Sequence, residues 1–320
     1  MDFPRESREL MKTLADADPA APTACSQWTV HDLVAHLAAG AKENADLIED
    51  ELAGRPARAT RTFAEREPSF VAMPDERLRE ELIQQSGRKL AALEALSAMG
   101  PDAAYQFTGR PFTAAMALTH ARSEAAIHRW DIAGDDETSK ELLAAPELTR
   151  HAVEILNTLP ILCEAPLSRA RVAQIDTLRI VLRSPGQPDV VMDINPDRAH
   201  FELAENDQPA DGDAVVETDA AHRLLSIWGR CAPHHPSTIT ADPKLWSPVA
   251  RVLWDAIPDG RCSASVGEDE ASAQRAVTKS ERRRIRIRRG HRRQKPPKSP
   301  PPKSPPASQP PASQPPLSPL

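Results

Sequence analysis

The spacing of apolar residues divides the chain into a helical first half and a strand-rich second part. Five segments carry apolar residues three or four positions apart, over residues 5–17, 29–54, 75–97, 113–132 and 145–163. That spacing is typical of amphipathic helices. Residues 55–73 and 101–109 lack it and are predicted to be connections. Helices joined by short to medium connections indicate an antiparallel four-helix bundle, followed by one further helix.

The pattern changes after residue 175. Short β-branched or alternating runs predict the strands of a small, mostly antiparallel sheet, over residues 176–183, 189–194, 199–203 and 214–217. Two short helices are predicted after the strands, one capped by Asp219 and one over residues 242–256. We therefore expect an α+β protein, with a helical-bundle domain over residues 1–165 and a small α+β domain over residues 170–260.

Charge and composition separate a tail from this body. The whole chain of 320 residues has a net charge of −6, but residues 275–320 alone carry +12 and residues 1–274 carry −18. Residues 261–320 contain a basic block and a repeat rich in proline and serine, which bury too little apolar surface to fold, so a disordered tail is predicted. Such a tail could bind nucleic acid, an anionic membrane or a proline-recognition domain. It is equally consistent with a solvated appendage.

The sequence gives no sign of secretion or of a membrane span. The N-terminus is charged, and no apolar run approaches the roughly 18 residues of a spanning helix, so a cytoplasmic protein is expected. Its four cysteines are far apart in the chain and form no CxxC pair: Cys25, Cys163, Cys231 and Cys262. They predict neither a disulfide framework nor a zinc site of their own.

Candidate chemistry lies on the helix over residues 113–132. Glu124 and His128 are four residues apart, so both side chains lie on one helix face and offer two ligands for a metal such as zinc. His36, on the second helix, is a candidate third ligand or a core histidine. Asp32, one turn before His36, either orients that ring or caps the helix together with Thr29.

Three segments resemble the mycothiol-dependent maleylpyruvate isomerase family. Cys25–Gly40 reads CSQWTVHDLVAHLAAG, similar to the family's first motif, and Glu124–Asp131 reads EAAIHRWD, similar to its second. Thr218–Arg230, TDAAHRLLSIWGR, resembles the family's C-terminal, sterol-carrier-like domain. The resemblance covers roughly residues 5–258 and implies a DinB-like N-terminal bundle.

The resemblance also implies a site and a reaction. It assigns a metal, with zinc favoured among divalent ions, to His36, Glu124 and His128, and leaves an open fourth position typical of catalytic zinc. Mycothiol, a low-molecular-weight thiol, would add to the double bond of a cis-olefinic acid and leave after rotation, or would be transferred to another electrophile. Arg230 is the candidate catalytic residue that clamps a substrate carboxylate, or else an ordinary helix-end arginine. The alternative function is a non-catalytic metal-containing sensor or ligand-binding protein.

Overall fold

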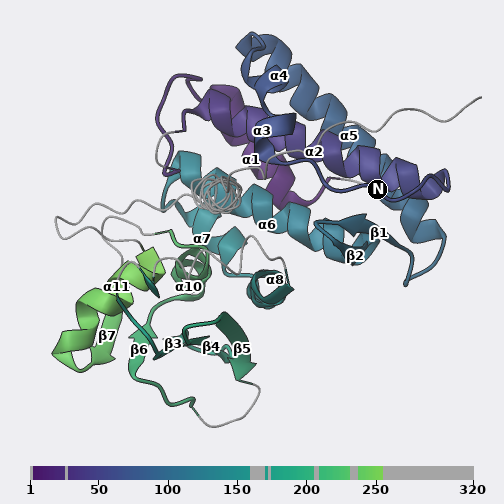
Figure 1. Ribbon diagram of the computed structural model, residues 1–320. Helices are drawn as coiled ribbons and strands as arrows, with labels where there is room; N and C mark the ends of the chain where they lie inside the picture. Colours follow the sequence, from purple (N-terminus) through teal and green to yellow (C-terminus); the bar gives the residue numbers. More distant parts are fainter. Residues whose placement is uncertain are drawn as a thin grey trace, which may run out of the picture. The chain divides into compact units, whose positions relative to one another are not determined.

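The first part of the chain is a bundle of helices in the computed structural model (Figure 1). The structure describes residues 3–25, 28–158, 170–171, 174–204, 209–230 and 237–254. The four bundle helices are α1 (Arg5–Asp16), α2 (Val30–Leu52), α5 (Asp75–Ala98) and α6 (Ala114–Ala133). Helix α2 packs along α5, while α6 packs against both α1 and α5. The predicted four-helix bundle is thus present.

Polar caps set the ends of these helices where the sequence places them. Thr29 and Asp32 form a reciprocal capping box at the start of α2, and the Thr113 side chain accepts a hydrogen bond from Met116 N at the start of α6. Helix α6 ends at Gly134, whose φ of 72° suits glycine. Helix α2 continues through Gly40 without a break.

Several short elements lie where the sequence predicts connections or nothing regular. They are α3 (Phe63–Arg66), α4 (Pro68–Val71), α7 (Glu137–Leu143) and a hairpin of β1 (Ala104–Phe107) with β2 (Arg110–Thr113). Segments of four to seven residues span at most two helical turns, so their apolar spacing carries little information. The fifth predicted helix is α8 (Pro146–Thr158); the remainder of its predicted range, residues 159–163, lies outside the described residues.

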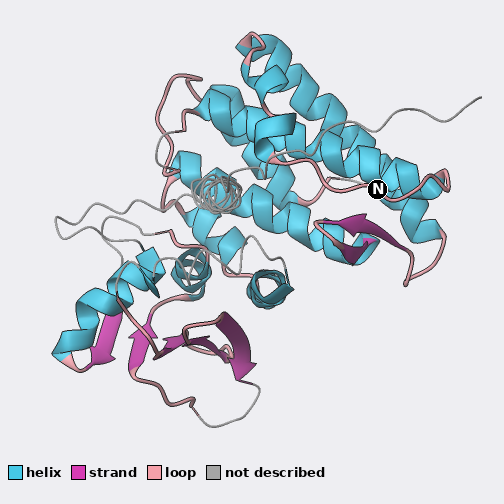
Figure 2. Cartoon of the chain, in the orientation of Figure 1, coloured by secondary structure: helices cyan, strands magenta, loops and turns pink. Residues whose placement is uncertain are grey.

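A five-stranded sheet follows, which Figure 2 shows in magenta. Its strands are β3 (Leu178–Arg183), β4 (Asp189–Ile194), β5 (Ala199–Ala204), β6 (Ala214–Glu217) and β7 (Thr238–Ala241). Their order is β5-β4-β3-β6-β7, and β3 pairs with β6 in parallel while the other pairs are antiparallel. Helix α10 (Ala220–Ile227), the 3₁₀ turn η1 (Pro243–Leu245) and α11 (Trp246–Trp254) complete the described part. The α+β fold class is therefore confirmed.

Two apolar clusters stabilise these elements. One lies within the bundle and includes Leu10, Val34, Leu78 and Ala125. The other is larger and runs from bundle residues such as Trp130 to sheet residues and α11. The described residues from 3 to 254 fall within one compact unit, and the predicted boundary between residues 165 and 170 stays a prediction.

The predicted tail, residues 261–320, and the cysteines Cys163, Cys231 and Cys262 all fall outside the described residues. Within the described ranges, none of the helices combines the length and apolar character needed to cross a membrane.

A pair of histidines joins α6 to α8. His120 Nδ1 lies 3.2 Å from His151 Nε2, and His151 is only 4% exposed. Burial lowers the pKa of His151 to about 3, helped by His120 and Arg110 and opposed by Glu124. His151 is therefore neutral in the folded protein at every pH where an unfolded histidine, with a pKa of about 6.5, begins to protonate.

This pair predicts a loss of stability in mild acid. As the pH falls below about 6.5, His151 becomes protonated in the unfolded chain but stays neutral in the folded chain. Protonation therefore stabilises the unfolded state, and folding becomes less favourable. Between pH 7 and pH 5 this one group should cost about 2 kcal/mol. Urea unfolding of the wild type and of His151→Gln at both pH values measures it, because the difference between the two proteins isolates residue 151. An identical pH dependence in the two proteins would contradict the prediction.

Candidate metal centre

The three predicted ligands meet where α2 faces α6. Glu124 Oε2 lies 3.5 Å from His128 Nε2 and 3.9 Å from His36 Nε2. Their ligand atoms all lie within 4.8 Å of one another. Tetrahedral coordination with bonds of roughly 2.0–2.2 Å separates neighbouring ligand atoms by about 3.4 Å. The donor set therefore fits a single ion with small adjustments.

Both histidines present Nε2 to the common point because carboxylates hold their other ring nitrogen. His36 Nδ1 lies 2.7 Å from Glu67 Oε1, and His128 Nδ1 lies 2.8 Å from Asp131 Oδ2. A carboxylate beside Nδ1 keeps the proton there and leaves the Nε2 lone pair for a metal. This arrangement is typical of histidine ligands.

Of the two roles predicted for Asp32, the structure shows helix capping. Its Oδ2 accepts hydrogen bonds from the backbone N and the hydroxyl of Thr29, at 2.9 and 2.6 Å. It caps α2, and Glu67 rather than Asp32 contacts the His36 ring.

Aromatic rings pack around the His36 imidazole. The Trp28 and Phe63 rings lie 4.9 and 5.0 Å from it, centroid to centroid, and the His36 side chain is 11% exposed. Trp28 belongs to the first sequence motif, while Phe63 lies on the short helix α3 and Glu67 immediately follows it. The stretch predicted as a plain connection thus supplies two of the groups that fix His36.

Arg230 lies behind His128 in a buried polar cluster. Its Nε and Nη2 donate to the two carboxylate oxygens of Asp131, at 3.1 and 3.0 Å, and Nη2 also lies 3.3 Å from Cys25 Sγ. The Cys25 thiol donates to Asp131 Oδ2 at 3.1 Å. Arg230 is 5% exposed, so clamping a substrate carboxylate would require it to leave Asp131. That predicted role stays a prediction.

Among the described residues, two groups of side chains have metal-ligand chemistry: the trio of His36, Glu124 and His128, and a second group of Cys25, His128 and Asp131. The charge distribution favours the trio. In the second group the guanidinium of Arg230 already balances Asp131 and lies against the thiol. A cation there would face a buried positive charge at close range.

The protonation of the trio indicates what a cation would replace. Burial opposes ionisation of Glu124, but hydrogen bonds from His128 and His36 outweigh it and hold the pKa of Glu124 well below its usual range. Burial likewise opposes charging of His128, yet Asp131, Cys25 and Glu124 raise its pKa well above the usual value. A proton on His128 therefore balances the carboxylates, and a divalent cation would displace it.

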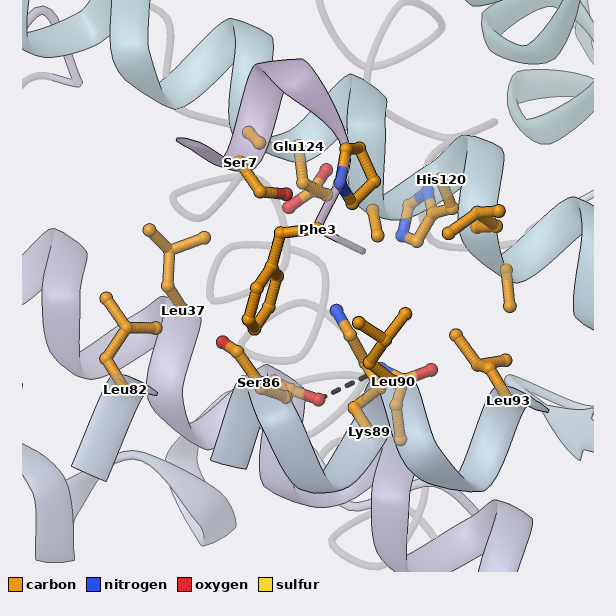
Figure 3. A pocket seen from close by; sticks show the side chains of 18 of the residues that line it. Phe3, Ser7, Leu37, Leu82, Ser86, Lys89, Leu90, Leu93, His120 and Glu124 are labelled. Atoms are coloured by element: carbon orange, nitrogen blue, oxygen red, sulfur yellow. Dashed lines mark hydrogen bonds between the residues drawn. The ribbon is translucent and has the colours of Figure 1, made fainter. Parts of the chain in front are cut away.

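The trio borders a cavity. His36 and Glu124 line a space of about 130 Å³ between α1, α2, α5 and α6, with Lys89, His120 and Phe3 in its wall (Figure 3). A catalytic metal site needs such an open side, whereas a structural site is closed by protein ligands. The geometry is therefore that of a site which admits a small molecule.

The sequence alone did not assign roles to Glu67, Asp131 or Cys25. Asp131 carried a usable signal, since it follows His128 by three residues on one helix and so lies on the same face. Cys25 and Glu67 come from irregular chain distant in sequence from their partners. Their positions give no periodic signal.

Comparison with known proteins gives one family and two solved structures. Residues 2–133 match the family model described as the mycothiol maleylpyruvate isomerase N-terminal domain. The crystal structure of the mycothiol-dependent maleylpyruvate isomerase is 18% identical with a TM-score of 0.49, and that of a point mutant is 17% identical with a TM-score of 0.48. Each comparison covers 73% of this chain and 88% of the other. Among curated proteins, no sequence matches.

Proposed function

We propose that the protein is a metal-dependent enzyme that uses mycothiol as its thiol, because residues 2–133 match the family model of mycothiol maleylpyruvate isomerase N-terminal domains. It would isomerise a cis-olefinic acid or transfer the thiol to another small electrophile. The observation that carries this proposal is the convergence of His36, Glu124 and His128 beside a cavity.

The three ligands would hold Zn²⁺, which when bound lowers the pKa of a thiol so that the thiolate exists at neutral pH. The chain's own residues prepare the site. Glu67 and Asp131 hold the imidazole protons on Nδ1, and Trp28 and Phe63 pack against the His36 ring. Ligands fixed in this way need little reorganisation when an ion and a thiol bind.

The position of Arg230 supports a role other than the predicted clamp on a substrate carboxylate. Its ion pair with Asp131 fixes the carboxylate that orients His128, so Arg230 serves as a positioning residue. The predicted substrate clamp requires the guanidinium to exchange Asp131 for a substrate carboxylate, at the expense of a buried ion pair.

Turnover by the zinc-loaded full chain tests the function. With mycothiol and maleylpyruvate, or with a panel of small electrophiles, we expect product formation that needs both the metal and the thiol. NMR follows the change of the cis double bond or the formation of a thioether. Omitting the thiol and replacing Glu124 by alanine should each reduce the rate to background. A zinc-loaded protein that turns over none of these compounds with mycothiol would overturn the proposal.

A further inference from the structure

We propose that Lys89 binds the carboxylate of the substrate, and that the cavity beside the metal ligands takes a short organic acid with an apolar body. This inference rests on the proposed function and names the substrate class for it. Lys89 lies on α5, across the cavity from α6, which carries Glu124 and His128.

Lys89 points into the cavity. Figure 3 shows its side-chain nitrogen directed from α5 toward the space that Glu124 and His120 face from α6. Phe3 enters the same space from the N-terminus, beside Ser7 of α1. The cation thus shares one small volume with the metal ligand Glu124.

Lys89 differs from the other described lysines in its partners. Each of the others pairs with a nearby carboxylate at 2.7–3.4 Å: Lys12 with Glu9, Lys42 with Asp46, Lys140 with Glu137 and Lys244 with Asp242. Within the described ranges, the Lys89 ammonium makes no hydrogen bond or ion pair, and only the longer-range charge of Glu124 stabilises it. An anion in the cavity would supply the missing partner.

Burial supports the same conclusion. It lowers the pKa of Lys89, while Glu124 opposes that change. A cation bound to Glu124 would take up this carboxylate's charge and leave the ammonium with less compensation. A ligand carboxylate against Lys89 restores the balance, so metal and acid should favour each other's binding.

The size and lining of the cavity define the rest of the ligand. Its volume of about 130 Å³ is close to that of cavities which hold benzene, about 150 Å³, so a chain of roughly four to six carbons fits. Leu37, Leu90 and Phe107 line it and suit an aliphatic body. Arg66 also lines it, but its guanidinium stacks on the Phe63 ring at 4.4 Å. Both cations line the cavity, and we assign the carboxylate to Lys89 because its ammonium pairs with no carboxylate among the described residues.

Calorimetry with hexanoate and its uncharged analogue hexanamide tests the proposal on the zinc-loaded full chain. The wild type should prefer hexanoate. Lys89→Met should weaken hexanoate binding by about tenfold to hundredfold, the range for losing one charged hydrogen bond, and leave hexanamide unaffected. Lys89→Arg should retain most of the affinity. Lys140→Met, which removes a surface lysine paired with Glu137, should behave as the wild type.

Equal hexanoate affinity in the wild type and Lys89→Met would overturn the proposal, since the metal or another group would then hold the acid. Absence of hexanoate binding to the wild type would overturn it as well. The zinc content of Lys89→Met should equal that of the wild type, because Lys89 is not a ligand.

The test also separates this inference from the proposed function. If Lys89→Met keeps thiol-dependent turnover with an unchanged KM for anionic substrates, the role of Lys89 is wrong and the proposed function stands. If the protein binds hexanoate selectively but turns over no substrate, the proposed enzymatic function is wrong and the carboxylate site at Lys89 stands.

Discussion

Zinc should be absent from His128→Ala, His36→Ala and Glu124→Ala proteins that have been purified and dialysed, whereas the wild type should retain about one ion per chain. Each variant removes one of the three predicted ligands, whose donor atoms lie within 4.8 Å of one another. Two remaining ligands hold an ion far more weakly, and the loss should be seen directly by mass spectrometry of metal content. Thiol-dependent activity should disappear with the metal.

Two further variants make this test specific. His31 lies on the same helix as His36, but its ring contacts Asp75 and the Val71 carbonyl, so His31→Ala should keep its zinc. Cys25→Ser distinguishes the two possible ligand groups. If Cys25→Ser lost the ion and Glu124→Ala kept it, the metal would lie at Cys25, His128 and Asp131 and the assignment would be wrong. Circular dichroism of each variant is the control for folding.

The parts of the fold and of the site that could be predicted from the sequence are those on long helices with regularly spaced apolar residues. Helices α2 and α6 are 23 and 20 residues long, so their apolar spacing and caps define them well. The i,i+4 spacing of Glu124 and His128 fixes their common face on α6. The motif around His36 then indicates the third ligand, and the structure brings all three together.

The groups that orient the ligands depend on contacts that no local pattern records. Glu67 reaches His36 from a stretch without apolar period, and Cys25 reaches Asp131 across 106 positions of the sequence. Lys89 shows the same limit, since one lysine on an amphipathic helix resembles a solvated residue. Only packing against α6 reveals that it enters a cavity.

Asp131→Ala should destabilise the protein by about 3–5 kcal/mol and weaken its zinc affinity by about 10–100-fold. The two effects share one cause. The Asp131 side chain is fully buried, pairs with Arg230 at 3.0 Å and accepts a hydrogen bond from His128 at 2.8 Å. Its loss leaves a guanidinium buried without its carboxylate and frees the His128 ring to turn. Urea unfolding of metal-free protein measures the first effect, and competition with a zinc chelator measures the second.

A double-mutant cycle with Arg230→Met separates stability from metal affinity. In the double variant neither charge of the buried pair remains, so the stability loss should be smaller than the sum of the single losses, by about 0.5–3 kcal/mol. Zinc affinity should not recover, because methionine at position 230 cannot orient His128. Additive stability losses would mean that the pair contributes no coupling. Recovered zinc affinity would mean that Asp131 acts on the metal through the charge of Arg230 and not through its hydrogen bond to His128.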